Sequence, residues 1–302
     1  MYKKMLLVDT IHIIGGNFFM KSFAIKSNNN QINKYLLNSF ENYNLEDFHI
    51  SYKKFKIYNN IILHYQNKNT IEFYDCFCEI LTNCIIKYYE ESILKQLITL
   101  NYFYFSKIEQ SMILKSCLSY LKDINNLENM SRRENIYISL LKYIDENKSF
   151  ILDGFVNFRL ENYKKVLEYV VDLNVNNFLI EKEYNEFVSL LKIYINSKSS
   201  KCNCLHLLYK NDNAILLDEN YNQIDTKNYL LDAKYLSDIS FSENDFILNA
   251  LLTLLPKKLY IHLLTKSDEF IETLKLIFTN RISLCKHCSL CTKYKYLNKI
   301  KP

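Results

Sequence analysis

The chain has 302 residues, of which 49% are hydrophobic and 24% are charged. This composition excludes disorder on the scale of the whole chain and supplies enough apolar surface for one large domain or two to three small ones. The formal net charge of +5 is weak evidence for a polyanionic partner.

Residue usage is skewed towards amino acids with A/T-rich codons. The chain holds 3 Gly, 2 Pro and no Trp, against 25 Tyr and 19 Phe. This bias is typical of a low-GC genome. Lys and Tyr counts therefore carry little functional information.

The N-terminal residues do not predict a secretion signal. Asp9 and His12 interrupt the apolar stretch 5–14 before a signal core is complete. No stretch reaches the roughly 18 apolar residues that a membrane span needs. The nine cysteines are then expected to be reduced thiols, and the protein is expected in the cytoplasm.

Residues 1–69 mix short strand-like runs and are predicted to form a small α/β module. Residues 50–58 and 60–65 are separated by the turn signal Asn59-Asn60. Such a pattern predicts a β-hairpin.

From residue 70 to 196 the hydrophobic period becomes helical. Ser131 and Glu134 have the spacing of a helix capping box, and Asp153-Gly154 can cap the next helix. That helix has an apolar stripe that includes Phe155 and Phe158. The polar segment 174–177 indicates either a helical hairpin or one long, kinked helix.

The polar stretch 196–201 is the best candidate linker, and residues 201–302 form a second α/β region. Its expected order is β-β-α-β-α-β, which favours a small mixed sheet covered by helices. The predicted fold class is therefore α+β: a small N-terminal α/β module, a central helical region and a C-terminal mixed sheet with helices. The predicted strands are 202–209, 214–217, 258–264 and 281–284, and the predicted helices are 243–255 and 268–278, the latter capped by Ser267.

The stretch from Ser131 to Cys291 resembles the YtxC-like family, which is linked to sporulation in endospore-forming Firmicutes. The resemblance implies a sporulation-associated role, with no established reaction to carry over. The similar sequence segments are long and ungapped: Arg133–Asn135, Asp153–Leu160, Glu181–Leu191, Leu251–Pro256 with Ile261-His262, and Cys285–Cys288.

The sharpest chemical pattern is Cys285-Lys-His-Cys288-Ser-Leu-Cys291. A Cys-x-x-Cys turn brings two sulfurs close enough to share one tetrahedral zinc ion. A third cysteine also fits part of an iron–sulfur run. The predicted cofactor is therefore zinc or an iron–sulfur cluster, with Cys291 or His287 as the next ligand.

A fourth ligand must come from elsewhere in the chain. Cys202, Cys204 and His206 alternate along a predicted strand and so share one face. We expect them to converge on the C-terminal thiols if their strand lies beside 281–284. His262, on another predicted strand, is a further candidate. The alternative is that these side chains line a half-buried face as small hydrophobes. A redox dithiol is less favoured, because the Cys pair does not clearly open a helix.

Other motifs assign no catalytic residue. Walker loops, Gly-x-Ser-x-Gly and His-Glu-x-x-His patterns are absent from the sequence. Arg159 lies in a phrase that resembles the family and can bind a carboxylate or phosphate, although a local salt bridge is the simpler interpretation. Arg133 is a second candidate for an interaction, and Arg132-Arg133 is expected to be exposed.

Four functional hypotheses follow, the last of which is an enzyme of undescribed type. The first is a non-enzymatic sporulation factor that acts through another protein. The second is a metal-binding regulatory or redox protein built on the C-terminal thiols. The third is a nucleic-acid binder, because residues 281–302 contain six basic residues and no acid.

Overall fold

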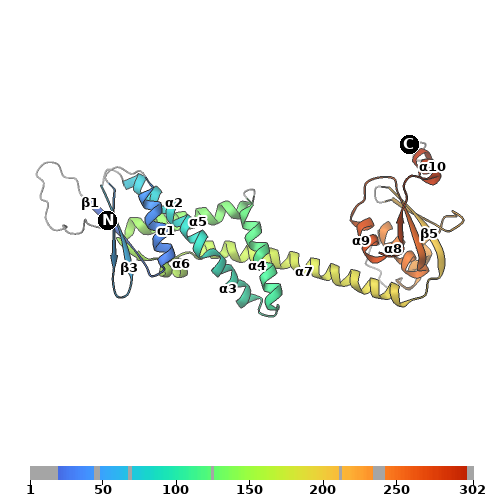
Figure 1. Cartoon of the computed structure of the whole chain (residues 1–302), viewed down its shortest axis with the longest axis horizontal. Helices are drawn as coiled ribbons and strands as arrows, with labels where there is room; N and C mark the ends of the chain where they lie inside the picture. Colours follow the sequence, from blue (N-terminus) through green and yellow to red (C-terminus); the bar gives the residue numbers. More distant parts are fainter. Residues whose placement is uncertain are drawn as a thin grey trace, which may run out of the picture. The chain divides into compact units, whose positions relative to one another are not determined.

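The computed structural model describes residues 20–43, 48–66, 70–123, 126–210, 213–233 and 242–297. The apolar stretch 5–14 lies outside the described residues. So do Lys299 and Lys301, two of the six basic residues in the C-terminal segment 281–302. The chain divides into two compact units, Met1–Phe178 and Leu179–Pro302, and each is described by itself. Together they contain helices and two four-stranded mixed sheets, so the predicted α+β class is confirmed (Figure 1).

The first unit contains a four-stranded sheet in the order β2-β3-β1-β4, with α1 packed against its first three strands. β3 pairs antiparallel with both β1 and β2, and β4 runs parallel to β1. The sheet therefore also uses residues from beyond the expected 1–69 module. The predicted hairpin is confirmed, but the expected turn at Asn59-Asn60 is wrong, because both residues belong to β3 and the turn lies at residues 55–58. The elements are β1 (Met20–Ser27), α1 (Asn30–Glu41), β2 (His49–Lys54), β3 (Asn59–Gln66) and β4 (Ser149–Ile151).

Alternation along β3 explains why the sheet has one buried face. Ile61, Leu63 and Tyr65 are buried, whereas the residues between them are half-buried. This period-2 pattern turns every second side chain towards the helices. The core between sheet and helices is aromatic, with Phe23 and Phe73 both packed against Phe77.

Helices dominate the rest of the first unit, as the change of period at Thr70 predicts (Figure 1). The three-residue strand β4 separates α5 from α6. The helices are α2 (Thr70–Tyr88), α3 (Glu90–Asn101), α4 (Lys107–Lys122), α5 (Leu127–Glu146), α6 (Leu152–Arg159) and α7 (Glu161–Ser197).

Three local expectations in this region are wrong. Ser131 does not cap a helix, because α5 begins at Leu127 and already includes it. The N-cap of α6 is Ile151, and Asp153 instead accepts a hydrogen bond from Tyr89 at 2.5 Å. Phe158 does not face inward but is 82% exposed.

The choice between a helical hairpin and a long helix is settled by α7, which runs without interruption from Glu161 to Ser197. Asn174, expected to break the helix, is buried, donates to the Val170 carbonyl at 2.8 Å and accepts from Ser116 at 2.6 Å. These two hydrogen bonds satisfy the side-chain amide of Asn174 while its backbone stays helical, so the helix continues through this residue.

The second unit holds a sheet in the order β6-β5-β7-β8. β5 and β6 form an antiparallel hairpin, whereas β5–β7 and β7–β8 are parallel. The predicted β-β-α-β-α-β order is confirmed, and a last helix, α10, follows it. The elements are β5 (Cys202–Lys210), β6 (Asn213–Leu217), the 3₁₀ segment η2 (Thr226–Ala233), α8 (Glu243–Leu254), β7 (Pro256–Leu263), α9 (Glu269–Ile277), β8 (Ile282–Leu284) and α10 (Ser289–Leu297).

The helix ends of this unit follow from local chemistry. Ser242 and Asp245 form a capping box at the start of α8, and Leu255 ends that helix in a left-handed conformation before Pro256 begins β7. The N-cap of α9 is Asp268, one residue after the expected Ser267.

One face of this sheet packs against α8, α9 and the second part of α7. Leu205, Leu207 and Tyr209 of β5 share a buried cluster with residues of those helices, such as Val188 of α7. Because side chains alternate along a strand, His206 and Leu208 point to the opposite face. They are also buried there, so both faces of β5 are covered at this position.

Candidate metal centre

The cysteine-rich turn begins where the parallel strands β7 and β8 end. Cys285 directly follows β8, and its N–H donates to the Ile261 carbonyl of β7 at 2.9 Å. This bond places the turn beside His262, near the end of β7. Cys288 immediately precedes α10, and Cys291 lies in its first turn. The carboxyl edge of two neighbouring strands and the start of one helix therefore meet at this point.

Four potential ligands converge there. The Nδ1 atom of His262 lies 3.5 Å from the sulfurs of both Cys288 and Cys291, and the Cys291 sulfur lies 3.8 Å from those of Cys288 and Cys285. All four ligand atoms are within 4.8 Å of one another. A tetrahedral zinc ion with ordinary Zn–S and Zn–N bond lengths spaces its sulfurs about 3.8 Å apart and its sulfur and nitrogen about 3.6 Å apart.

Burial and hydrogen bonds shift the pKa values of three groups in the cluster, His262, Cys285 and Cys288. Burial lowers the pKa of His262, with His206 adding to the effect, so the imidazole is neutral and its nitrogen lone pair is available. Burial and the neighbouring thiols raise the pKa of Cys285 to about 11. Burial alone would raise the pKa of Cys288, but backbone N–H groups of Cys291 and Leu290 and the adjacent thiols outweigh it and lower the pKa.

His206 supports the centre from outside it. Its Nδ1 atom lies 3.1 Å from Nε2 of His262, and both rings are buried. If Nδ1 of His262 binds an ion, Nε2 carries the proton and donates it to His206. The ring of His206 is itself stacked on Tyr260 and lies against Tyr221. Such an outer partner fixes the orientation and tautomer of a metal-binding histidine.

The structure brings together four of the seven residues predicted from the sequence. Cys204, His206 and His287 are not in the four-ligand set. The expected convergence of β5 on the C-terminal thiols is wrong, because β7 lies between β5 and β8. His262 stands on that intervening strand and supplies the nitrogen donor.

His287 occupies the turn between Cys285 and Cys288 in a left-handed conformation, with φ of 70°. A non-glycine residue rarely adopts such an angle outside a constrained turn. The positive φ closes the Cys285–Cys288 turn, and the His287 side chain is exposed. His287 therefore shapes the turn through its backbone conformation, and its side chain does not belong to the four-ligand set.

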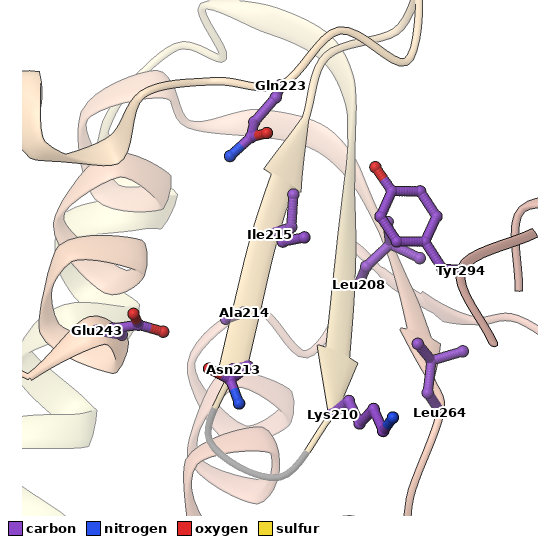
Figure 2. Close-up of a pocket in the computed structure, with 9 residues that line it drawn as sticks. All are labelled: Leu208, Lys210, Asn213, Ala214, Ile215, Gln223, Glu243, Leu264 and Tyr294. Atoms are coloured by element: carbon purple, nitrogen blue, oxygen red, sulfur yellow. The ribbon is translucent and has the colours of Figure 1, made fainter. Parts of the chain in front are cut away.

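Helix α10 lies on the sheet face that carries His206 and Leu208. Figure 2 shows its Tyr294, Leu208 of β5 and Leu264 among the residues that line one pocket. These three side chains line part of a cavity of about 520 Å³ that extends to the β6 edge. Cys288 and Cys291, at the start of α10, lie against His262 and so place the start of this helix beside β7.

The two arginines predicted to make interactions are both exposed. Arg133 donates to Asn83 at 2.9 Å, and Arg159 lines a cavity beside Phe158 at the end of α6. Neither belongs to the thiol cluster, and each remains a prediction as an interaction residue.

Arg132 was expected to be exposed, and that expectation is wrong. Its guanidinium forms a buried ion pair with Glu90 and donates to the Leu121 carbonyl at 2.9 Å. Glu90 also accepts from Tyr163 at 3.0 Å. No sequence signal reveals this network, because its members lie on four helices, α3, α4, α5 and α7, that meet only in the folded unit.

The fold and the cluster define an α+β protein with a three-cysteine, one-histidine centre at the edge of its second sheet. A model of the YtxC-like family matches residues 75–283, and the chain belongs to that family. His262 lies within the matched residues, whereas Cys285, Cys288 and Cys291 lie beyond them. Family membership by itself therefore does not assign the centre.

A curated relative gives the same family relationship. The chain is 22% identical over 211 residues to "Uncharacterized protein YtxC" of Bacillus subtilis (strain 168), which covers 68% of this chain and 74% of the relative. No solved structure shows significant similarity. Among the helices in the described part of the chain, none combines the length and apolar character needed to cross a membrane.

Proposed function

We propose that this chain is a non-enzymatic, sporulation-associated protein of the cytoplasm that acts through protein contacts, and that a structural zinc ion holds its second unit together. The observation that carries the zinc assignment is the closed set of His262, Cys285, Cys288 and Cys291. Four protein ligands fill a tetrahedron and leave no open position for a substrate, which is the pattern of a structural site. Reduced thiols also suit a cytoplasmic location.

A single zinc ion fits the ligand spacing better than an iron–sulfur cluster does. A cluster places its irons and inorganic sulfides between the ligands and therefore spreads the thiols further apart. Four of the distances among the ligand atoms are 3.5–3.8 Å, and all of the ligand atoms lie within 4.8 Å of one another, which leaves room for one ion. A mixed sulfur and imidazole donor set in tetrahedral geometry is also typical of zinc.

Elemental mass spectrometry of protein purified without chelator tests the zinc assignment. We expect about one zinc ion per chain in the parent and none in a Cys285→Ser/Cys288→Ser double variant. A matched Cys202→Ser/Cys204→Ser variant should keep its zinc, because neither residue belongs to the four-ligand set. A folded parent that is free of metal would rule the site out.

Exposed apolar side chains support the proposal of protein contacts. Phe103 and Ile108, at the corner between α3 and α4, are each 76% exposed, and Leu100, Tyr104 and Met112 are exposed beside them in the sequence. Large apolar residues grouped on a surface in this way are typical of protein-binding sites. This corner lies inside the residues matched by the family model. The sporulation role is supported by the family resemblance.

The contact proposal predicts that a Phe103→Ser/Ile108→Ser variant lowers the yield of heat-resistant spores as strongly as deletion of the gene. Its unfolding curve and zinc content should stay unchanged, because both side chains are in solvent. Ile71→Ser, at a residue that is 79% exposed on a different helix, is the matched control. Normal sporulation of the deletion strain would refute the role, and normal sporulation of the double variant would refute the surface.

A further inference from the structure

Cys288 and Cys291 form a second chemical arrangement within the thiol cluster. Cys288 is the residue before α10, and the first bond of that helix runs from the Thr292 N–H to the Cys288 carbonyl. Cys291 lies one helical turn further on, with its sulfur 3.8 Å from that of Cys288. The Cys285–Cys288 pair lies in the turn before the helix, as expected, but the second pair, Cys288-Ser-Leu-Cys291, opens α10.

The two sulfurs differ in access to solvent. Cys288 is half-buried, whereas Cys291 is 3% exposed. A small oxidant in solution can therefore reach Cys288 before Cys291, as it can the equally half-buried Cys285, and only Cys288 stands at the start of α10. The buried partner is then within reach of the same sulfur. This asymmetry is the arrangement of an attacking thiol and a resolving thiol.

We propose that Cys288 and Cys291 are a dithiol–disulfide couple, with low-molecular-weight disulfides as oxidants, and that the bound metal ion protects them. Only the protecting role of the ion rests on the zinc site proposed above; the dithiol–disulfide couple does not. Oxidation at this pair regulates metal retention, because it removes two of the four ligands. The ion then leaves to solvent, and α10 loses its link to β7.

The exchange proceeds in two balanced steps. Deprotonated Cys288 attacks one sulfur of the small disulfide, forms a mixed disulfide and releases the first small thiolate. Deprotonated Cys291 then attacks the Cys288 sulfur, breaks the mixed bond and releases the second small thiolate. Both leaving thiolates take up the protons that the two cysteines lost to water. Two electrons pass from the protein to the small disulfide, which becomes two thiols.

Trypsin separates the three cysteines usefully for a test. Cleavage after Arg281, Lys286 and Lys293 places Cys285 in one peptide and both Cys288 and Cys291 in the next. Full-length protein is stripped of metal, exposed to glutathione disulfide, alkylated and digested. We expect peptide 287–293 to be unalkylated and lighter by two hydrogens, with Cys285 alkylated. A main product in which a disulfide links peptides 282–286 and 287–293 would overturn the assignment. So would recovery of all three cysteines as alkylated thiols.

Single variants test the order of attack. Cys291→Ser should accumulate a mixed disulfide with glutathione at Cys288, whereas Cys288→Ser should leave Cys291 reduced. Cys285→Ser should form the 288–291 bond as the parent does. To exclude oxidation of a merely unfolded chain, the same reaction is run in urea. The equilibrium constant for the bond should be at least about tenfold larger in the native protein. Equal constants in both states would refute a couple built by the fold.

Zinc protection is measured separately. At free zinc ten times its dissociation constant, only about a tenth of the chains lack metal, so oxidation should slow about tenfold. Specific oxidation that zinc does not slow, in protein that never binds zinc, would refute the protecting ion and the proposed zinc function while leaving the couple established. Zinc binding without formation of the 288–291 disulfide would refute the couple alone.

Discussion

Replacing Arg132 with methionine is expected to lower the free energy of unfolding of the first unit by about 3–5 kcal/mol. Arg132 and Glu90 are both buried and paired. The substitution keeps the apolar length of the side chain but leaves the Glu90 carboxylate with the Tyr163 hydroxyl as its hydrogen-bond donor in a region closed to water. An unpaired buried charge costs more than the ion pair itself contributes.

A double-mutant cycle distinguishes the unpaired charge from general damage. Arg132→Met/Glu90→Leu removes both charges and should be more stable than Arg132→Met alone, because an apolar pair in the same space can be nearly neutral. Urea unfolding monitored by circular dichroism gives the loss in free energy of unfolding for each of the two single variants, Arg132→Met and Glu90→Leu, and for the double variant. If the double variant loses the sum of the two single losses, the charges do not interact and the network has been misinterpreted. Arg133→Met, at the exposed neighbour, should cost less than about 0.5 kcal/mol.

The second large effect is expected at His206, which touches no ligand sulfur. His206→Ala should weaken zinc binding by about 10- to 100-fold, because His262 loses the partner that fixes its orientation. His206→Asn should recover part of the loss, since its amide oxygen can accept the His262 Nε2 proton in place of Nδ1. Affinity is measured by competition with a chromophoric chelator.

A spectroscopic readout separates positioning from general destabilisation. Cobalt replaces zinc in such centres, and its thiolate bands report three sulfur ligands whether or not His206 is present. In His206→Ala those bands should persist while the ligand-field bands, which are sensitive to the histidine, shift. Cys204→Ser, on the same face of β5, should change neither the spectrum nor the affinity. Wild-type affinity in His206→Ala would show that the hydrogen bond between the two histidines has no role.

The elements were more predictable than their arrangement. Strand and helix periods gave the second unit in its observed order, because hydrophobic spacing along each segment is local information. The order of strands in the sheet depends on pairing between distant segments, which no local pattern specifies. For that reason Cys204 and His206 were expected among the thiols, although β7 separates their strand from β8.

The centre shows the same division. Cys285, Cys288 and Cys291 are recognisable from their spacing, since one tight turn and one helical turn suffice to bring them together. His262 could be proposed as a candidate but not selected, because its place beside Cys285 depends on the parallel pairing of β7 and β8. Arg132 was misjudged for a related reason. The Ser131–Glu134 pattern fits a helix start, but α5 begins one turn earlier.

The parallel strands of the second unit also set the order of events during folding. The β5–β6 hairpin joins neighbouring residues, whereas the β5–β7 pairing must close the long segment that contains η2 and α8. Non-local closure of this kind is slow. His262 meets the three thiols only after β7 has paired with β8, so the complete tetrahedron forms late. If the proposed zinc ion is captured at that stage, we expect it to stabilise the native state but not the transition state. It would therefore slow unfolding and leave the refolding rate nearly unchanged.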